Sequence, residues 1–162
     1  MAALRDWGVR REKQQTHRPT TSLGAGRRYA EPFLATMEPM YSAQLLDHFQ
    51  NPRNAGDLAA ADAVAEISNP VCGDVVRVSL QVCDERITEI RFKAKGCVPA
   101  MACGSALTEL ARGKTVAEAR KLKRDDLIAA VGGLPPASSH AAQLALDALS
   151  AALNQITAAR KP

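Results

Sequence analysis

Aromatic side chains are scarce in this sequence: Phe, Trp and Tyr together make up 4% of its 162 residues. Proteins that bind single-stranded nucleic acids stack the bases on aromatic rings, so this composition argues against such a surface. Basic charge does not supply an alternative, because residues 40–162 hold fourteen Lys and Arg against thirteen Asp and Glu. We therefore expect no nucleic-acid partner.

Long apolar runs are also missing. A transmembrane helix needs about 18 consecutive apolar residues, a secretory signal needs a shorter apolar region near the start, and neither is found. We expect no membrane association and a cytoplasmic location. In that reducing compartment, the four cysteines are expected to be metal ligands, nucleophiles or core residues rather than disulfides. The remaining composition, 46% hydrophobic and 23% charged, is typical of a globular protein with one domain.

The chain divides into a basic extension and one domain. Residues 1–36 mix pairs of Arg with Thr, Gln and Gly, show no hydrophobic periodicity, and are predicted to be disordered. We interpret residues 1–39 as an extension upstream of a domain at 40–158, whose true start is one of two nearby methionines, with 159–162 as a tail. An Arg-rich transit peptide is the alternative. Three acidic residues count against it: Asp6, Glu12 and Glu31.

Three segments are predicted to be strands. Residues 75–82 and 87–95 alternate apolar and polar side chains, which is typical of a sheet with one buried face and one solvent-exposed face. Asp84-Glu85 is predicted to form the tight turn between them, although it lacks the usual Gly. Residues 64–68 are a weaker strand candidate, which we place at an edge of the sheet.

Helical signals stand before and after these strands. Caps and prolines mark where helices begin and end: Ser42, Asn51-Pro52, Pro99, Gly113, Thr115 with Glu118, and Gly132-Gly133. The order is one helix, then strands, then further helices. This order predicts an α+β fold, in which helices pack on one face of a small antiparallel three-stranded sheet.

Two thiols and a carboxylate flank the predicted hairpin. Cys72-Gly73-Asp74 precedes it and Cys97 follows it, and an antiparallel hairpin returns the chain to the level where it began. We therefore expect these side chains to meet, as ligands for zinc or iron. Gly73 leaves the backbone free to turn, and a helix beginning after Cys97 favours a thiolate there. The alternatives are a simple turn with an inert thiol at Cys72 and a buried strand-end cysteine at Cys97.

Two more residues are candidate metal ligands. His140 lies at the start of the last predicted helix, where a neutral imidazole would suit zinc or iron, or where it is simply an exposed first-turn residue. Cys103 lies near the start of its helix, but it shares an apolar stripe with Leu107 and Leu110, so a core thiol is the competing interpretation. Cys83, at the far turn of the hairpin, is interpreted as structural.

Several motifs follow one another between residues 40 and 157. They are Met40-Tyr-Ser, Leu46-Asp-His-Phe-Gln-Asn-Pro-Arg-Asn54, Cys72-Gly-Asp74, Phe92-Lys, Gly96-Cys97, Gly113-Lys-Thr-Val, and Leu134-Pro-Pro136 with His140. Together they resemble the NifU N-terminal / IscU family of iron–sulfur cluster scaffolds. The resemblance implies the same α+β fold and a platform rather than an enzyme. Carried over by position, it implies that Cys72, Asp74, Cys97 and His140 are ligands.

Members of that family accept sulfur from a cysteine desulfurase, collect iron from a donor, assemble a [2Fe–2S] cluster and pass it to apo-proteins. Some relatives bind zinc at the same positions. The resemblance therefore implies a transient [2Fe–2S] cluster, iron or zinc, with the desulfurase, the iron donor and the apo-proteins as partners. It adds an Hsp70-type chaperone as a further partner and leaves the choice between monomer and homodimer open.

The sequence departs from the family pattern in two places. Ala141 stands where a third Cys usually follows the His, and in scaffolds with three cysteines that thiol is a principal sulfur acceptor. Cys103 is the candidate replacement, and a thiol from another protein is the alternative. After Leu134-Pro-Pro136, Ala137-Ser138 replaces the usual Val-Lys of the chaperone-recognition motif.

Two other functions fit the same residues. One is a zinc- or iron-binding interaction protein that kept the fold but lost cluster assembly. The other is a zinc-dependent sulfur-transfer partner of a cysteine desulfurase. Stable metal without acid-labile sulfide would favour the first of these, and persulfide turning over on one cysteine would favour the second.

Overall fold

A computed structural model of the chain describes residues 40–159. Its centre is an antiparallel sheet in the order β1-β2-β3, formed by β1 (Ala63–Ser68), β2 (Val75–Cys83) and β3 (Arg86–Lys95). The strands lie close to where the alternation of side chains predicts them, with β1 at an edge. The expected disordered extension falls outside the described residues.

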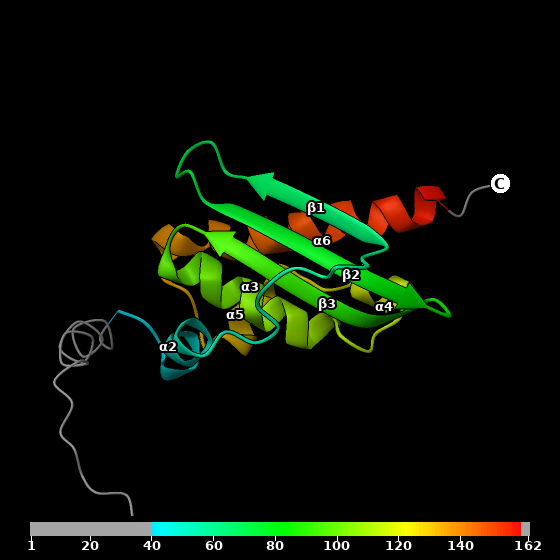
Figure 1. The fold of residues 1–162 in the computed structure, drawn as a ribbon. Coiled ribbons are helices and arrows are strands. Elements are labelled where there is room, and N and C mark those ends of the chain that lie inside the picture. Colours follow the sequence, from blue (N-terminus) through cyan, green and yellow to red (C-terminus); the bar gives the residue numbers. More distant parts are fainter. Residues whose placement is uncertain (1–39, 160–162) are drawn as a thin grey trace, which may run out of the picture.

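Helices lie behind and beside the sheet in Figure 1, and the two longest, at Val98–Ala111 and His140–Ala159, cover one of its faces. They are α2 (Ala43–Gln50), α3 (Val98–Ala111), α4 (Val116–Ala119), α5 (Arg124–Ala130) and α6 (His140–Ala159), with a 3-10 turn at Pro136–Ser138. The predicted α+β arrangement is confirmed. Within the described residues, no helix is both long and apolar enough to span a membrane.

The covered face of the sheet forms the core. Val76, Val78 and Leu80 of β2 are completely buried, as are Ile87 and Ile90 of β3. They belong to one cluster with apolar residues of α3 and α6: Leu107, Ala145, Leu149 and Leu153. Removing each large aliphatic side chain from water contributes roughly 2 kcal/mol. This packing holds β2 and β3 against α3 and α6.

The β2–β3 hairpin turns without a glycine. Asp84 and Glu85 both have positive φ, at 48° and 63°, which is the backbone geometry of a favoured two-residue hairpin turn. The two strands pair along their length with one register shift between Gln81 and Val82, and at the open end of the hairpin Val75 lies opposite Lys95. The residues just before β2 and just after β3 therefore face each other.

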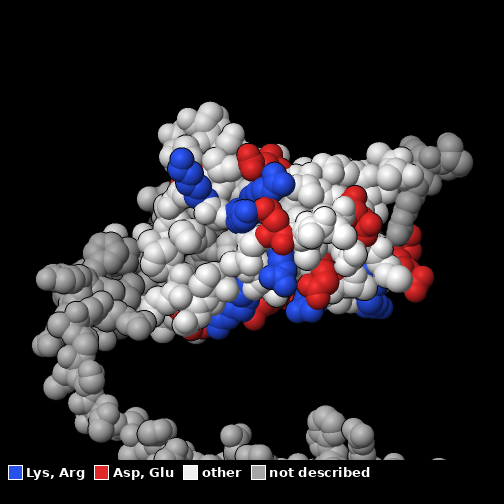
Figure 2. Space-filling view, in the orientation of Figure 1, with Lys and Arg blue, Asp and Glu red and all other residues white. Residues whose placement is uncertain are grey.

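The uncovered face of the sheet carries paired charges. Asp57, in the loop that crosses this face, accepts a hydrogen bond from the Arg77 guanidinium at 3.1 Å and another from the Lys93 ammonium. Figure 2 shows Lys and Arg interspersed with Asp and Glu on this side of the molecule. Such a mixed surface lacks the one-sign field that attracts nucleic-acid phosphates.

A buried polar contact holds α2 against α3. His48 is 8% exposed, and its Nδ1 shares a 2.9 Å hydrogen bond with Ser105 Oγ. Burial lowers the pKa of His48, and the Arg53 guanidinium lowers it further, while Glu109 and Asp47 act in the opposite direction. The neutral imidazole is therefore the form that the fold favours.

We expect the free energy of unfolding to fall as the pH drops from about 7.5 to about 5.5, because an unfolded His48 has an ordinary pKa near 6.5. The stability that the lowered pKa of His48 contributes is fully present above the unfolded pKa and is lost as the pH falls below it. His48→Gln should lose less stability over the same interval. Urea unfolding curves of both proteins at both pH values measure this, and equal losses would contradict the assignment.

Candidate metal centre

The first ligand loop is a turn between β1 and β2. Its ends are tied by hydrogen bonds from the Asn69 N–H to the Asp74 carbonyl and from the Gly73 N–H to the Asn69 carbonyl, both at 2.8 Å. Gly73 has a φ of +75°, so the predicted need for a glycine at this turn is confirmed. The turn leaves Cys72 exposed and directs Asp74 inward, where it is 3% exposed.

The second ligand loop is the junction between β3 and α3. Gly96 has a φ of +146°, and a Cβ at this position would lie 2.1 Å from Asp74 Oδ1. Only glycine therefore lets the carboxylate approach so closely. Cys97 occupies the N-cap position of α3, and Pro99 lies in the first turn of that helix.

The Asp74 carboxylate joins the two loops. Its Oδ1 accepts a 3.0 Å hydrogen bond from the Cys97 N–H, and its Oδ2 accepts a 3.1 Å hydrogen bond from the Cys97 thiol. The predicted meeting of Asp74 and Cys97 at the open end of the hairpin is confirmed, because the carboxylate and the thiol lie side by side although 23 positions separate them.

His140 reaches the same carboxylate from the first residue of α6. Its Nε2 lies 3.5 Å from Asp74 Oδ2, and the ligand atoms of Cys72, Asp74 and His140 all lie within 4.8 Å of one another. The Nε2 atom is buried but has no hydrogen-bond partner among the described residues. A buried nitrogen without a partner is costly, and a bound metal would satisfy it.

In the contact between Asp74 and Cys97, the negative charge is on the carboxylate rather than on the Cys97 thiol. Burial raises the pKa of Asp74, but hydrogen bonds from the Cys97 and Cys72 thiols and from the Cys97 N–H, together with the nearby His140, outweigh it and bring the pKa below its usual value. Burial and then the hydrogen bond to Asp74 raise the pKa of Cys97 to about 11. The expectation of a thiolate at Cys97 was wrong for the metal-free site, because the helix N-terminus is too weak to offset these two effects.

Cys103 is not brought into this group. Its side chain is completely buried in the cluster that contains Leu107, and burial raises the pKa of its thiol to about 12. Cys83 lies exposed at the far end of the hairpin, as expected. The structure thus brings Cys72, Asp74 and His140 within 4.8 Å of one another, places Cys97 against Asp74, and leaves Cys103 in the core.

The four converging residues offer two sulfurs, one oxygen and one nitrogen. Zinc and iron accept this mixture, and four donors suit either one tetrahedral ion or the two irons of a [2Fe–2S] cluster with two protein ligands each. The donors come from three separate segments: the β1–β2 turn, the β3–α3 junction and the start of α6.

Comparison with known proteins agrees with the family resemblance seen in the sequence. The sequence profile of the NifU-like N terminal domain matches residues 40–161. The chain belongs to this family. It is 48% identical over 114 residues to the iron-sulfur cluster assembly scaffold protein IscU 1 of Archaeoglobus fulgidus, an alignment that covers 70% of this chain and 74% of that protein.

Two further comparisons span most of the NifU-like domain. The iron sulfur cluster assembly protein 1, mitochondrial, of Debaryomyces hansenii is 41% identical over 126 residues, which cover 75% of this chain and 70% of that protein. The crystal structure of a nitrogen-fixing NifU-like protein (N-terminal) from Brucella abortus superposes with a TM-score of 0.62 at 24% identity. That likeness covers 75% of this chain and 97% of the Brucella chain, and it shows a shared fold.

One position that shapes the candidate metal centre was not identified from the sequence. Gly96 was read only as part of a motif, yet its missing Cβ makes room for Asp74. The signal was a glycine between a strand and a candidate ligand, which is typical of a close backbone approach.

Ala141, where the family resemblance implies a third cysteine, is completely buried.

We expect Gly96→Ala to weaken Zn²⁺ binding about ten- to a hundredfold, because the added methyl displaces Asp74 from both Cys97 and His140. Isothermal titration with Zn²⁺ measures the effect. Gly113→Ala is the matched control, since Gly113 also has a positive φ, of +79°, but nothing lies within 4 Å of its Cβ position. Equal losses in the two variants would attribute the effect to backbone strain instead.

Proposed function

We propose that this NifU-like domain is a scaffold on which iron–sulfur clusters are assembled and from which they are transferred. The convergence of Cys72, Cys97 and His140 on the Asp74 carboxylate carries the proposal. Relatives at 41–48% identity are named for iron–sulfur cluster assembly, which supports it.

Each ligand has a distinct part in the proposal. Cys72 and Cys97 bind iron as thiolates, and iron displaces the proton that the Cys97 thiol shares with Asp74 in the metal-free protein. Asp74 supplies an oxygen, a harder ligand than sulfur, which suits a cluster that must leave. His140 supplies a neutral nitrogen through its otherwise unpartnered Nε2.

The scaffold has no catalytic turnover of its own in this proposal. Its partners are a cysteine desulfurase, an iron donor and the apo-proteins that receive a [2Fe–2S] cluster. An Hsp70-type chaperone is a further partner that would bind near Leu134-Pro135-Pro136, whose residues are half-buried or exposed. The cytoplasmic location and the choice between monomer and homodimer stay predictions from the sequence.

A single zinc ion is the second candidate occupant. Ligands around one tetrahedral zinc lie about 3–4 Å apart. The separations within the Cys72, Asp74 and His140 group, all within 4.8 Å, are close to this value. A domain that binds zinc without sulfide would be the metal-binding interaction protein that kept the fold but lost cluster assembly.

Anaerobic reconstitution of the full chain with iron, cysteine and a cysteine desulfurase decides between these functions. We expect visible charge-transfer absorption and about equal amounts of iron and acid-labile sulfide, because the four donors match the four ligand positions of a [2Fe–2S] cluster. Cys72→Ser and Cys97→Ser should lose most of the absorption. Cys83→Ser is the control and should retain it, and a colourless protein holding only zinc would refute the scaffold proposal.

The same assay tests whether the Cys103 thiol replaces the third cysteine that is missing at Ala141. Cys103→Ser should leave the cluster yield unchanged and lower the free energy of unfolding by roughly 1–3 kcal/mol, because it places a hydroxyl in the apolar core. A loss of cluster as large as that of Cys97→Ser would instead make Cys103 a ligand. Ala141→Cys should increase cluster retention if the site is one thiol short.

A further inference from the structure

The outer edge of β3 is paired with loops at two places. Near its start, the Ile87 N–H donates to the Lys114 carbonyl and the Gly113 N–H donates to the Ile87 carbonyl, both at 2.8 Å. Further along, the Phe92 N–H donates to the Asn54 carbonyl and the Gly56 N–H donates to the Phe92 carbonyl. These loops protect an edge that would otherwise offer unpaired backbone groups to another chain.

The hydrogen bonds between these loops and the outer edge of β3 stop before β3 reaches the metal centre. After Gly56, the chain leaves the edge and crosses the sheet, where the Leu58 N–H donates to Ser79 Oγ. Ala94 lies two residues beyond Phe92, so its N–H and C=O also point away from β2. Within residues 40–159, no loop backbone donates to or accepts from Ala94.

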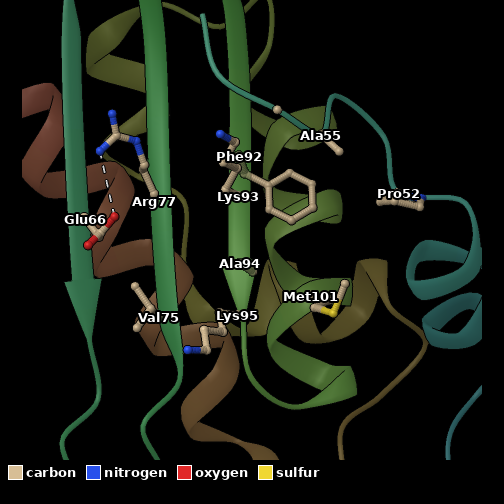
Figure 3. A pocket seen from close by; sticks show the side chains of 11 residues that line it. Pro52, Ala55, Glu66, Val75, Arg77, Phe92, Lys93, Ala94, Lys95 and Met101 are labelled. Carbon is tan, nitrogen blue, oxygen red and sulfur yellow. Dashed lines mark ion pairs between the residues drawn. The ribbon is translucent and has the colours of Figure 1, made fainter.

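A groove of about 600 Å³ includes this open edge and continues over the neighbouring part of the uncovered sheet face, where Glu66, Val75 and Arg77 also line it. Figure 3 shows Phe92, Pro52 and Met101 around the space between β3, the loop and α3, with Lys95 at the end of the strand. Most of the lining is apolar. The groove therefore combines unpaired backbone groups with an apolar pocket, the two features by which proteins bind an extended peptide as an added strand.

The groove leads directly to the ligands and carries an unpaired positive charge there. Val75 and Lys95, which line one end, are the chain neighbours of Asp74 and Gly96. Arg77 and Lys93 are paired with Asp57, whereas Lys95 makes no ion pair with any residue of the described chain. An acidic residue in the bound segment would complement it.

We propose that the β3 edge at Ala94 docks an extended, cysteine-bearing segment of the apo-protein that receives the cluster. The proposal rests on the scaffold function and names the surface that its acceptor uses. An apo iron–sulfur protein lacks the cluster that orders its cysteine segments, so these segments are available as extended chain. A segment running along β3 past Ala94 places its following residues beside Cys97.

This docking brings incoming thiols to the atoms that they must replace. In the transfer, acceptor thiolates form bonds to iron as the bonds from Cys72 and Cys97 break, and protons released by the incoming thiols pass to the departing ligands. Iron and sulfide keep their oxidation states, so the exchange needs no further reactant. An apolar residue in the groove and an acidic residue at Lys95 set the register of the incoming strand.

Ala94→Pro tests the edge, because it removes the outward N–H without touching the hydrogen bonds to β2. The probe is an apo plant-type [2Fe–2S] ferredoxin, titrated calorimetrically into the metal-free full chain. We expect Ala94→Pro to weaken binding about tenfold, the effect of one lost hydrogen bond at an interface. Ala94→Gly, which keeps the N–H while also weakening the strand, is the matched control and should bind within about twofold of the parent chain.

Hydrogen exchange supplies a test that needs no variant. Binding of the apo-ferredoxin should slow exchange at the Ala94 amide, and Lys95→Glu should weaken binding without altering the fold. Unchanged exchange at Ala94, together with equal affinities of the proline and glycine variants, would overturn the proposal. So would an apo-ferredoxin that does not bind the parent chain.

The proposals of a scaffold function and of a docking surface can be refuted independently of each other. Ala94→Pro should assemble as much cluster as the parent chain but transfer it to the apo-ferredoxin more slowly. A parent chain that assembles no cluster, yet protects Ala94 on binding the apo-ferredoxin, would refute the scaffold function and leave the docking surface standing. Normal assembly with transfer unaffected by the proline would remove the docking surface alone.

Discussion

The contact between the Asp74 carboxylate and the Cys97 thiol organises the centre of this protein. The carboxylate is almost completely buried, and burying a charge is costly unless hydrogen bonds compensate for it. Here the donors that compensate for it are the backbone and thiol of Cys97, with His140 close by. The groups that satisfy Asp74 in the metal-free protein are thus the same groups that would bind a metal beside it. The site is formed in advance, and its hydrogen bonds hold the ligands in place.

The sequence predicted the larger features because they follow from local rules. Alternation over 75–82 and 87–95 gave the strands, and the hairpin between them brought Cys97 to Asp74 without any knowledge of the helices. Ser42 and Thr115 act as the helix caps that their side chains indicate. Even the turn at Asp84-Glu85 was located correctly, although neither residue is the glycine that usually marks it.

The details that escaped prediction depend on distances across the fold. Whether Cys103 faces the site or the core depends on the rotation of α3 against the sheet, and both faces of its first turns are apolar. The protonation of Cys97 depends on burial and on a carboxylate 3.1 Å away, which outweigh the nearby helix terminus. The open edge at Ala94 depends on where a distant loop leaves the sheet. None of these quantities is encoded in a short pattern.

The three-segment origin of the ligands gives the bound metal a mechanical role. Cys72, Cys97 and His140 are separated by 25 and 43 positions along the chain, so a metal held by all of them closes two long loops at once. Such a closure acts as a reversible cross-link between the sheet and α6, and its effect on the unfolded chain resembles that of a disulfide. The bound metal and the folded structure therefore stabilise each other. A force that loosens α6 from the sheet weakens the hold on the cluster, and departure of the cluster loosens α6 in turn.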